Sequence, residues 1–185
     1  TTTGILTITG PGSTLTQTGS SLLTLGHASS GSATLNVLDG GIFNSGAGTI
    51  TIDATGAVNI GSATTSGTFN ANGNVNVSGG SINVTSGSFN LVSDRTFTAS
   101  QNAQINVDGF VELAGGTNWN LTSGADLSIS ERFGSSGLSG ETTNLTIDGV
   151  GSSLTTAVGF TSFWGHSGQI VDLKLRNSAT ANLGH

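Results

Sequence analysis

Few side chains in this sequence could take part in a reaction or hold a metal ion. The 185 residues include three His, ten Asp and Glu, four Lys and Arg, and no Cys, which leaves no thiol for catalysis or metal binding. His27 and His166 each follow a short apolar stretch and are the candidates for paired metal ligands. A Ser-His-Asp triad could draw on any of the 26 Ser, but no Gly-x-Ser-x-Gly turn leads into a helix.

Carboxylates are the other candidates, because glycosidases and polysaccharide lyases gather acidic and basic residues on one face. Four Asp residues end an apolar stretch before a small residue, where an Asp side chain commonly bonds its own turn; they are Asp39, Asp53, Asp108 and Asp148. A glycosidase would have to bring Glu112, Glu131 and Glu141 within ~10 Å of one another. Arg132 lies with Glu131 and Glu141 in the one cluster that contains both acidic and basic residues, and Lys174 is the single lysine. Calcium repeats of the form G-G-x-G-x-D are absent. We predict no catalytic, metal-binding or cofactor-binding site and no enzymatic activity.

The composition restricts the fold that could position these residues. Gly, Thr, Ser and Asn fill 100 of the 185 positions, and charged residues make up 8%. Long helix formers are scarce, which argues against a helical protein. Leu, Ile, Val and Phe still number 47, and a net charge of −6 is too small to hold the chain open. The chain is therefore predicted to fold around an apolar core.

The charge and hydropathy patterns also limit the partners. No basic cluster is present to hold a phosphate backbone, so nucleic acid is not expected as a partner. No apolar run approaches the ~20 residues that span a bilayer, so no membrane span is expected. Residues 1–20 lack the pattern of a signal peptide. We expect a soluble chain that is either mature or excised from a longer one.

Self-similarity appears at a constant offset of 139 residues. The stretch from Leu6 to Thr16 is repeated from Leu145 to Thr155, and Gly26-His27 is repeated as Gly165-His166. Between the copies lies a finer pattern of alternating apolar and polar residues, which predicts strands at Thr51–Asp53, Ala57–Gly61, Thr68–Asn70, Asn74–Val77, Ser81–Val84, Ser88–Leu91, Thr96–Thr98, Gln104–Val107, Phe110–Leu113, Asn118–Leu121 and Asp126–Ile129.

The spacing of these strands favours a coil over hairpins. Ten steps from Ile52 to Ile129 cover 77 residues, which leaves about three residues for each connection, and few Asn-Gly or Asp-Gly hairpin signals occur. Three strands close a triangular coil of roughly 23 residues, and the chain would make about eight coils. At ~4.8 Å per coil the rod would be about 40 Å long, and the two His residues would lie near 29 Å apart. They could not share a metal ion, and we expect each to bond a corner of the coil.

We therefore predict an all-β, right-handed parallel β-helix in a single domain, with the hand taken from the bias of parallel crossovers. Residues 5–43 form one repeat copy and residues 44–130 the middle coils. Residues 131–142 break the pattern and are predicted to form a loop that leaves the coil. Residues 143–185 form the second repeat copy.

Several of these segments carry a family resemblance. Residues 10–16, Leu25-Gly26-His27, residues 31–41 and residues 149–155 resemble the repeat G-x-G-S-x-L-x, L-x-V-G, G-x-L-x-I-x-x-G-G. That repeat is found in autotransporter passengers and in PEP-CTERM-associated surface proteins. The resemblance implies a right-handed β-helix on a bacterial cell surface and names no ligand, since the repeat is a scaffold.

We expect a non-enzymatic, extracellular structural or adhesive scaffold, cut from a longer repeat protein. Cell-surface glycans or proteins are possible partners. No capping helix or charged cap is visible at either end, so a second hypothesis is a subunit that stacks on itself end to end through uncovered terminal coils. An ice-binding surface is a weaker alternative, based on Thr-x-Thr runs at residues 7–9, 14–18 and 49–51. A polysaccharide-active enzyme is the last alternative.

Overall fold

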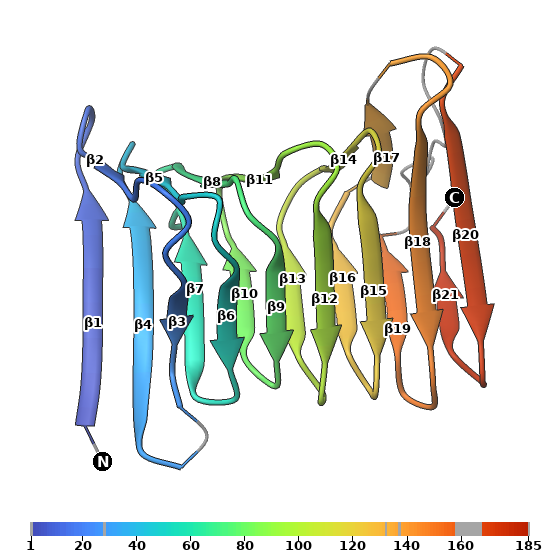
Figure 1. The fold of residues 1–185 in the computed structure, drawn as a ribbon, viewed down its shortest axis with the longest axis horizontal. Helices are drawn as coiled ribbons and strands as arrows, with labels where there is room; N and C mark the ends of the chain where they lie inside the picture. Colours follow the sequence, from blue (N-terminus) through green and yellow to red (C-terminus); the bar gives the residue numbers. More distant parts are fainter. Residues whose placement is uncertain (1, 28, 132, 137, 158–167, 185) are drawn as a thin grey trace.

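The protein is described by a computed structural model that covers residues 2–27, 29–131, 133–136, 138–157 and 168–184. Within these ranges the chain forms strands and turns and no helix (Figure 1). No helix in the described part of the chain is long and apolar enough to cross a membrane. Every pair of named strands in that part is parallel. The predicted parallel β-solenoid is confirmed.

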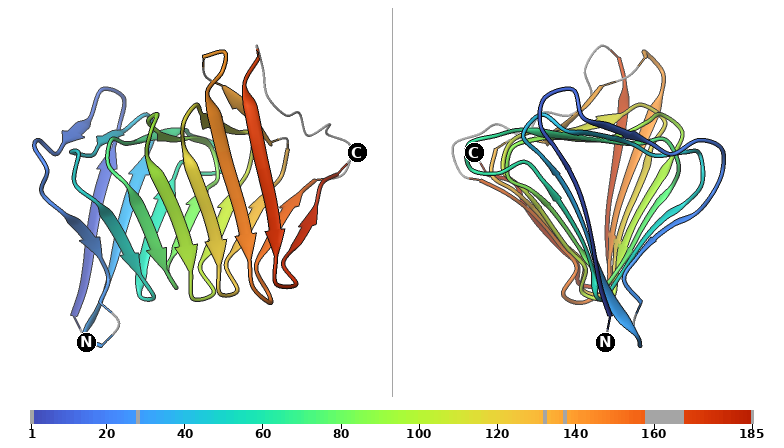
Figure 2. Two further views of the ribbon diagram at one scale, coloured as in Figure 1. Left: turned by 45° about the vertical axis from the view of Figure 1, so that its right-hand side comes forward. Right: turned by 90° about the vertical axis from the view of Figure 1, so that its left-hand side faces the viewer.

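The strands form three faces that enclose a triangular interior, seen along the axis in the right-hand view of Figure 2. Face A is an eight-stranded sheet of β1 (Thr2–Thr9), β4 (Gly31–Leu38), β7 (Gly56–Ile60), β10 (Ser81–Val84), β13 (Gln104–Val107), β16 (Asp126–Ile129), β19 (Ser153–Thr156) and β21 (Thr180–Asn182). Face C is a seven-stranded sheet of β3 (Leu23–Leu25), β6 (Ile50–Asp53), β9 (Val75–Ser78), β12 (Thr96–Ser100), β15 (Asn118–Thr122), β18 (Thr142–Asp148) and β20 (Ile170–Arg176).

Face B is divided into two sheets that follow one another along the axis (Figure 1). The first has four strands, which are β2 (Thr14–Thr16), β5 (Ile42–Asn44), β8 (Gly67–Ala71) and β11 (Gly87–Leu91). The second is the pair β14 (Val111–Ala114) and β17 (Phe133–Ser136). β11 and β14 belong to consecutive coils, and they are not hydrogen-bonded to each other.

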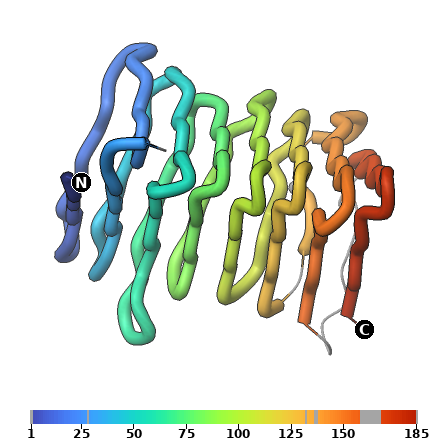
Figure 3. Tube along the Cα trace, turned by 90° about the horizontal axis from the view of Figure 1, so that it is seen from below, coloured from blue at the N-terminus to red at the C-terminus, as the bar shows by residue number. Residues whose placement is uncertain are grey.

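The chain makes about seven turns, which Figure 3 shows as successive steps along one axis. On face A the middle coils repeat after 22 to 24 residues, close to the predicted coil. The outer coils are longer, at 29 residues from Thr2 to its partner Gly31 and 27 from Ser153 to Thr180. The expected eight coils were too many because these end coils use more residues, partly in strands β1 and β20, which have eight and seven residues.

Alternation along each strand sends one set of side chains into the interior. All eleven strands predicted in the middle of the chain are present, and most of their apolar residues are buried. Phe89, Val107, Phe110 and Val111 are partly buried. Like residues stack in register on face A, where Leu35, Val58, Ile82, Ile105 and Leu127 form one interior column. Burying each such side chain contributes about 1.5–3 kcal/mol relative to leaving it exposed. This column and the other buried apolar residues form a single continuous core.

The two repeat copies, which are offset by 139 residues, lie on different faces. In the first copy Leu6 of β1 pairs with Leu35 of β4 on face A. In the second copy Leu145 of β18 pairs with Leu173 of β20 on face C. Three strands make one turn, and β18 comes seventeen strands after β1, which is five turns and two thirds. The second copy therefore starts on a different face from the first.

The segment expected to be a loop, residues 131–142, contains strand β17. Phe133 pairs with Val111 and is fully buried, and Ser135 is buried beside it. Phe133 supplies the apolar side chain that holds this segment on face B, which the Gly- and Ser-rich sequence around it obscures. Residues 138–141 do form a corner, where Glu141 N–H donates to the Leu138 carbonyl.

Stacked corners bring backbones so close that some interior positions admit glycine alone. A Cβ at Gly67 of β8 would lie 1.9 Å from the Val37 carbonyl oxygen of the previous coil. At Gly4 of β1 a Cβ would meet nothing within 4 Å.

We expect Gly67→Ala to lower the free energy of unfolding by about 2–3 kcal/mol, because backbone must move to relieve the overlap. Gly4→Ala is the matched control and should change it by less than about 0.5 kcal/mol. Chemical denaturation followed by circular dichroism measures both. Equal stability of the two variants would contradict the close approach of adjacent coils.

Candidate functional site

His27 lies in the corner between β3 and β4, as the sequence predicted. Its Nδ1 lies 3.0 Å from the hydroxyl oxygen of Ser30 and 3.2 Å from that of Ser29. Its backbone is tied to Gly31. The imidazole therefore braces this corner. His166, its counterpart in the second copy, lies outside the described residues.

Of the four Asp residues predicted to bond their own turns, three contact neighbouring coils instead, and no side-chain hydrogen bond of Asp53 is described. Asp39 accepts a hydrogen bond of 2.8 Å from the Thr9 hydroxyl of the coil before it. Hydrogen bonds from the hydroxyls of Thr65 and Thr9 lower the pKa of the Asp39 carboxyl below its ordinary value. Asp108 accepts from the Ser130 hydroxyl at 2.6 Å, and Asp148 from the side-chain amide of Asn177 at 2.6 Å. These carboxylates therefore link successive coils.

The remaining charged candidates lie on several elements of the described part of the chain. Glu112 lies on β14, Glu131 is exposed ahead of β17, and Glu141 accepts a hydrogen bond from the Leu138 N–H. Lys174 forms an ion pair with Asp172 on the outside of face C. Arg132 lies outside the described residues. Among the residues that the structure describes, no three His, Asp or Glu residues come together in a group that could hold a metal ion.

The Thr-x-Thr runs do not share a surface. Residues 7–9 lie on β1 of face A and residues 14–16 on β2 of face B. Residues 50 and 51 lie on β6 of face C. A flat array that orders ice would collect such runs on one face, so these three runs do not add up to one array.

Outward Asn side chains form a ladder along face A. Asn59 donates its side-chain N–H to Asn36 Oδ1 at 2.9 Å, and Asn83 donates to Asn59 at 3.1 Å. Asn106 continues the chain by donating to Asn83 at 3.1 Å. A shorter ladder runs down face B through Asn44, Asn70 and Asn90. Stacked amides of this kind bind each other along the axis, so most of this polar surface is engaged in holding coils together.

A shallow polar groove lies at the end of the face A ladder, with a volume of about 490 Å³. Its polar side chains come from three successive coils and include Asn83, Thr85, Asn106, Asp108, Ser128 and Ser130. Amide, hydroxyl and carboxylate groups at such spacing offer donors and acceptors to a polyhydroxylated ligand.

The break in face B has a cause in segment length. Face B is joined on one side to face A and on the other to face C, where all neighbouring coils are in register. Between the stacked positions Val84 and Phe97 the chain advances thirteen residues, but between Val107 and Trp119, the partners of those two residues, it advances twelve. A shift by one residue turns every side chain to the opposite face of a sheet. β14 therefore cannot pair with β11 while both of its ends stay in register.

The other coils obey the same parity rule. The length of each face B segment is counted from the face A residue that stacks with Val84 to the next face C residue that stacks with Phe97. In chain order these lengths are 15, 13, 15, 13, 12 and 16 residues. Among the face B strands that the structure describes, neighbours whose segments differ by an even number are paired, and the one neighbouring pair that differs by an odd number is β11 and β14.

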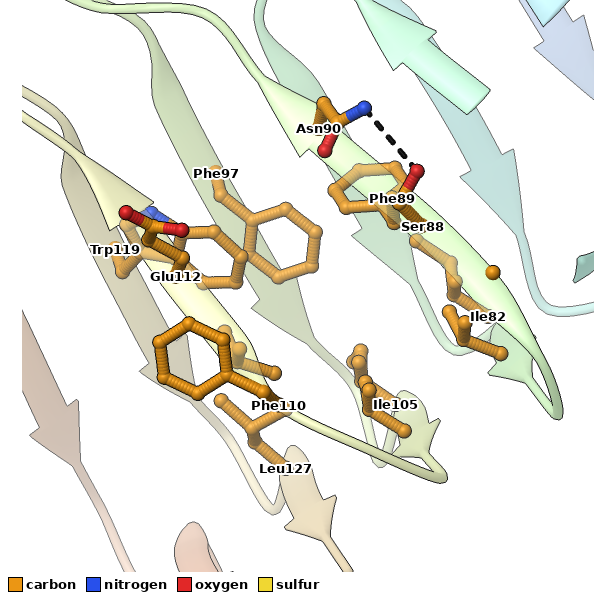
Figure 4. Close-up of a pocket in the computed structure, with 14 residues that line it drawn as sticks. Ile82, Ser88, Phe89, Asn90, Phe97, Ile105, Phe110, Glu112, Trp119 and Leu127 are labelled. Carbon is orange, nitrogen blue, oxygen red and sulfur yellow. Dashed lines mark hydrogen bonds between the residues drawn. The ribbon is translucent and has the colours of Figure 1, made fainter. Parts of the chain in front are cut away.

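A cavity of about 330 Å³ opens where face B is broken (Figure 4). Four aromatic side chains line it, namely Phe89, Phe97, Phe110 and Trp119. Ile82, Ile105 and Leu127 of face A form its floor, and Ser88, Asn90 and Glu112 contribute polar atoms. The indole Nε1 of Trp119 is buried and has no hydrogen-bond partner among the described residues.

Comparisons with protein families, with curated proteins and with solved structures find no match. The fold and the geometry above are therefore the basis for any functional conclusion.

Sequence reasoning did not find either recess. An odd difference in the number of residues between stacked positions predicts the break in face B and hence the cavity. The stacked positions, however, are known only once the register of faces A and C is known. The groove lacks any motif, because its Asn and Ser residues repeat along the whole chain.

The amide ladder yields a stability prediction. Asn83→Ala removes one hydrogen bond that Asn83 donates and one that it accepts, and should lower the free energy of unfolding by about 1–2 kcal/mol. Asn76 on β9 is half-buried and outward-facing, and no side-chain hydrogen bond of its own is described. Asn76→Ala is therefore the control and should have little effect. Urea denaturation separates the two, and equal losses would show that the ladder does not stabilise the fold.

Proposed function

We propose that this protein is a non-enzymatic scaffold with a structural or adhesive role on a bacterial surface, and that it forms part of a longer repeat protein. The observation that carries the proposal is the uninterrupted register of faces A and C over all the coils described. Stacked parallel coils with a shared core resist bending, because any bend would break hydrogen bonds on one face and empty the core beneath them.

The outer surface supports the same conclusion. Its side chains are mostly neutral Thr, Ser and Asn, and the amide ladders satisfy many of them within the protein. Asp39, Asp108 and Asp148 also link one coil to the next. Polar groups used in this way serve rigidity.

The resemblance to autotransporter passengers and PEP-CTERM-associated surface proteins favours an extracellular location. The segments that carry it, residues 10–16 and 31–41 among them, form corners and strands of the first two coils. An adhesive role would use the polar groove beside Asn106 and Asp108, where hydroxyl-rich cell-surface glycans could bind.

Location can be tested on intact cells of the source bacterium. Antibodies raised against the purified protein should label unpermeabilised cells, and protease added outside should remove the label. A cytoplasmic marker protein, probed in parallel, must stay unlabelled and intact. Labelling that requires permeabilisation would overturn the proposal.

A second candidate function is a subunit that stacks end to end into a filament. The supporting observation is that interior-facing side chains are exposed at both ends of the stack. Leu6 of β1 and Leu15 of β2 are 44% and 39% exposed, although their partners Leu35 and Phe43 in the next coil are buried. Leu175 of β20 is 48% exposed, although its partner Ile147 is buried.

The geometry of these ends fits a second copy of the chain. Both ends carry unpaired strand edges of the same triangular coil, and all strands run in parallel, so one copy placed above another continues faces A and C with the same polarity. A head-to-tail contact of this kind does not close and generates a filament.

Sedimentation velocity and electron microscopy should therefore detect rods that lengthen with protein concentration. Leu6→Lys and Leu175→Lys place a charge in the proposed contact and should each return the protein to a monomer. Leu138→Lys changes a leucine in a corner that is even more exposed, at 74%, and should leave assembly intact. A monomer at all concentrations would rule out this second function.

A further inference from the structure

An aromatic column runs along the interior of face B. Phe43, Phe69 and Phe89 pair in register on β5, β8 and β11, and their rings lie 4.9 and 5.3 Å apart between centroids. Phe133 of β17 faces the interior on the far side of the break and is fully buried. A single coil separates Phe89 from Phe133, and this coil contains β14.

In that coil the position within the column is filled by Val111. Val111 is the register partner of Phe133. It also precedes Trp119 by eight residues, as Phe89 precedes Phe97, the partner of Trp119. A valine thus stands where the coils before and after it have a phenylalanine, and the side chain is smaller by most of a ring.

The cavity lies at this position. Phe89, Val111 and Trp119 all line it, and β14 and β11 do not close over it because they are unpaired. The Phe97 and Trp119 rings stack at 4.3 Å with an interplanar angle of 21°, and Phe89 meets Phe97 edge-on at 6.0 Å. The wall is therefore a set of fixed aromatic surfaces that favour offset or edge-to-face contact with another ring.

Size and charge narrow the class of ligand. A cavity of about 150 Å³ lined by Leu, Ile and Phe is large enough for benzene, so one of about 330 Å³ has room for two rings. Glu112 is the one charged residue among those that line it, and in Figure 4 its carboxylate lies on the same side as Trp119. A carboxylate there repels anions such as fatty acids.

We propose that the break between β11 and β14 is a binding site for a neutral aromatic compound of about two rings, which occupies the place in the face B column that Val111 leaves open. The ligand enters between the two unpaired strands. Its rings then contact Phe89, Phe97 and Trp119. This proposal does not depend on the scaffold function, because the site lies inside the solenoid between two consecutive coils.

The neutral fluorescent probe N-phenyl-1-naphthylamine tests the site directly, because its naphthyl group supplies two fused rings and its phenyl ring can extend out between β11 and β14. The Trp164→Phe variant leaves Trp119 as the sole tryptophan, so energy transfer from Trp119 to the probe reports binding beside it. Saturable transfer with a stoichiometry of one is expected. An anionic analogue, 8-anilinonaphthalene-1-sulfonate, should bind at least ~10-fold more weakly because of Glu112.

Larger side chains at Val111 fill the cavity and so test whether the probe binds there. Val111→Leu should weaken probe binding and Val111→Phe should abolish saturable transfer, whereas Val150→Phe adds the same ring at an exposed corner and should not change it. Circular dichroism and thermal melting of each variant show whether it is folded. The graded leucine variant keeps the test decisive if the phenylalanine variant does not fold. Undiminished binding in folded Val111→Phe, or no saturable binding in the parent protein, would overturn the proposal.

Discussion

The constraint on which the rest of the structure depends is vertical register. Each strand has its hydrogen-bond partners in the coils before and after it, so a coil is stable only if its residues lie directly over their equivalents on every face. Register also brings like side chains together, which builds the column from Leu35 to Leu127 and the amide ladder from Asn36 to Asn106. The composition follows, because stacked charges would repel while stacked amides and apolar groups attract.

Much of the fold could be predicted because alternation and strand spacing are local properties. The eleven middle strands follow from apolar residues at every second position, and coil length follows from their spacing. Partners across coils were harder to predict. Asp39 does lie in a turn, as Asp-Gly predicts, but its carboxylate accepts a hydrogen bond from Thr9, thirty residues earlier. β17 was missed because Phe133 stands alone among Gly and Ser, and its burial depends on pairing with Val111.

The break in face B comes from the same constraint that orders faces A and C. When two faces are held in register, the third can vary its length only in steps of two residues without losing its pairing. The segment from Val107 to Trp119 is one residue shorter than the segment it follows, and the ladder fails at that point alone on the described face B. The aromatic column is interrupted in the same coil by Val111. Two independent departures, one in length and one in side-chain size, thus coincide and produce an opening into the core.

The rotation of the repeat bears on what the repeated residues are for. A partner that recognised the repeat as a surface would need both copies on one side of the rod, yet β1 and β4 lie on face A and β18 and β20 on face C. What the copies share is Leu and Ile positions that point inward and Gly and Ser positions in corners. These residues specify how a coil closes, whichever face it starts from. The similarity between the copies is therefore explained by folding, and a binding role has to come from features that occur once, such as the groove beside Asp108 and the opening beside Val111.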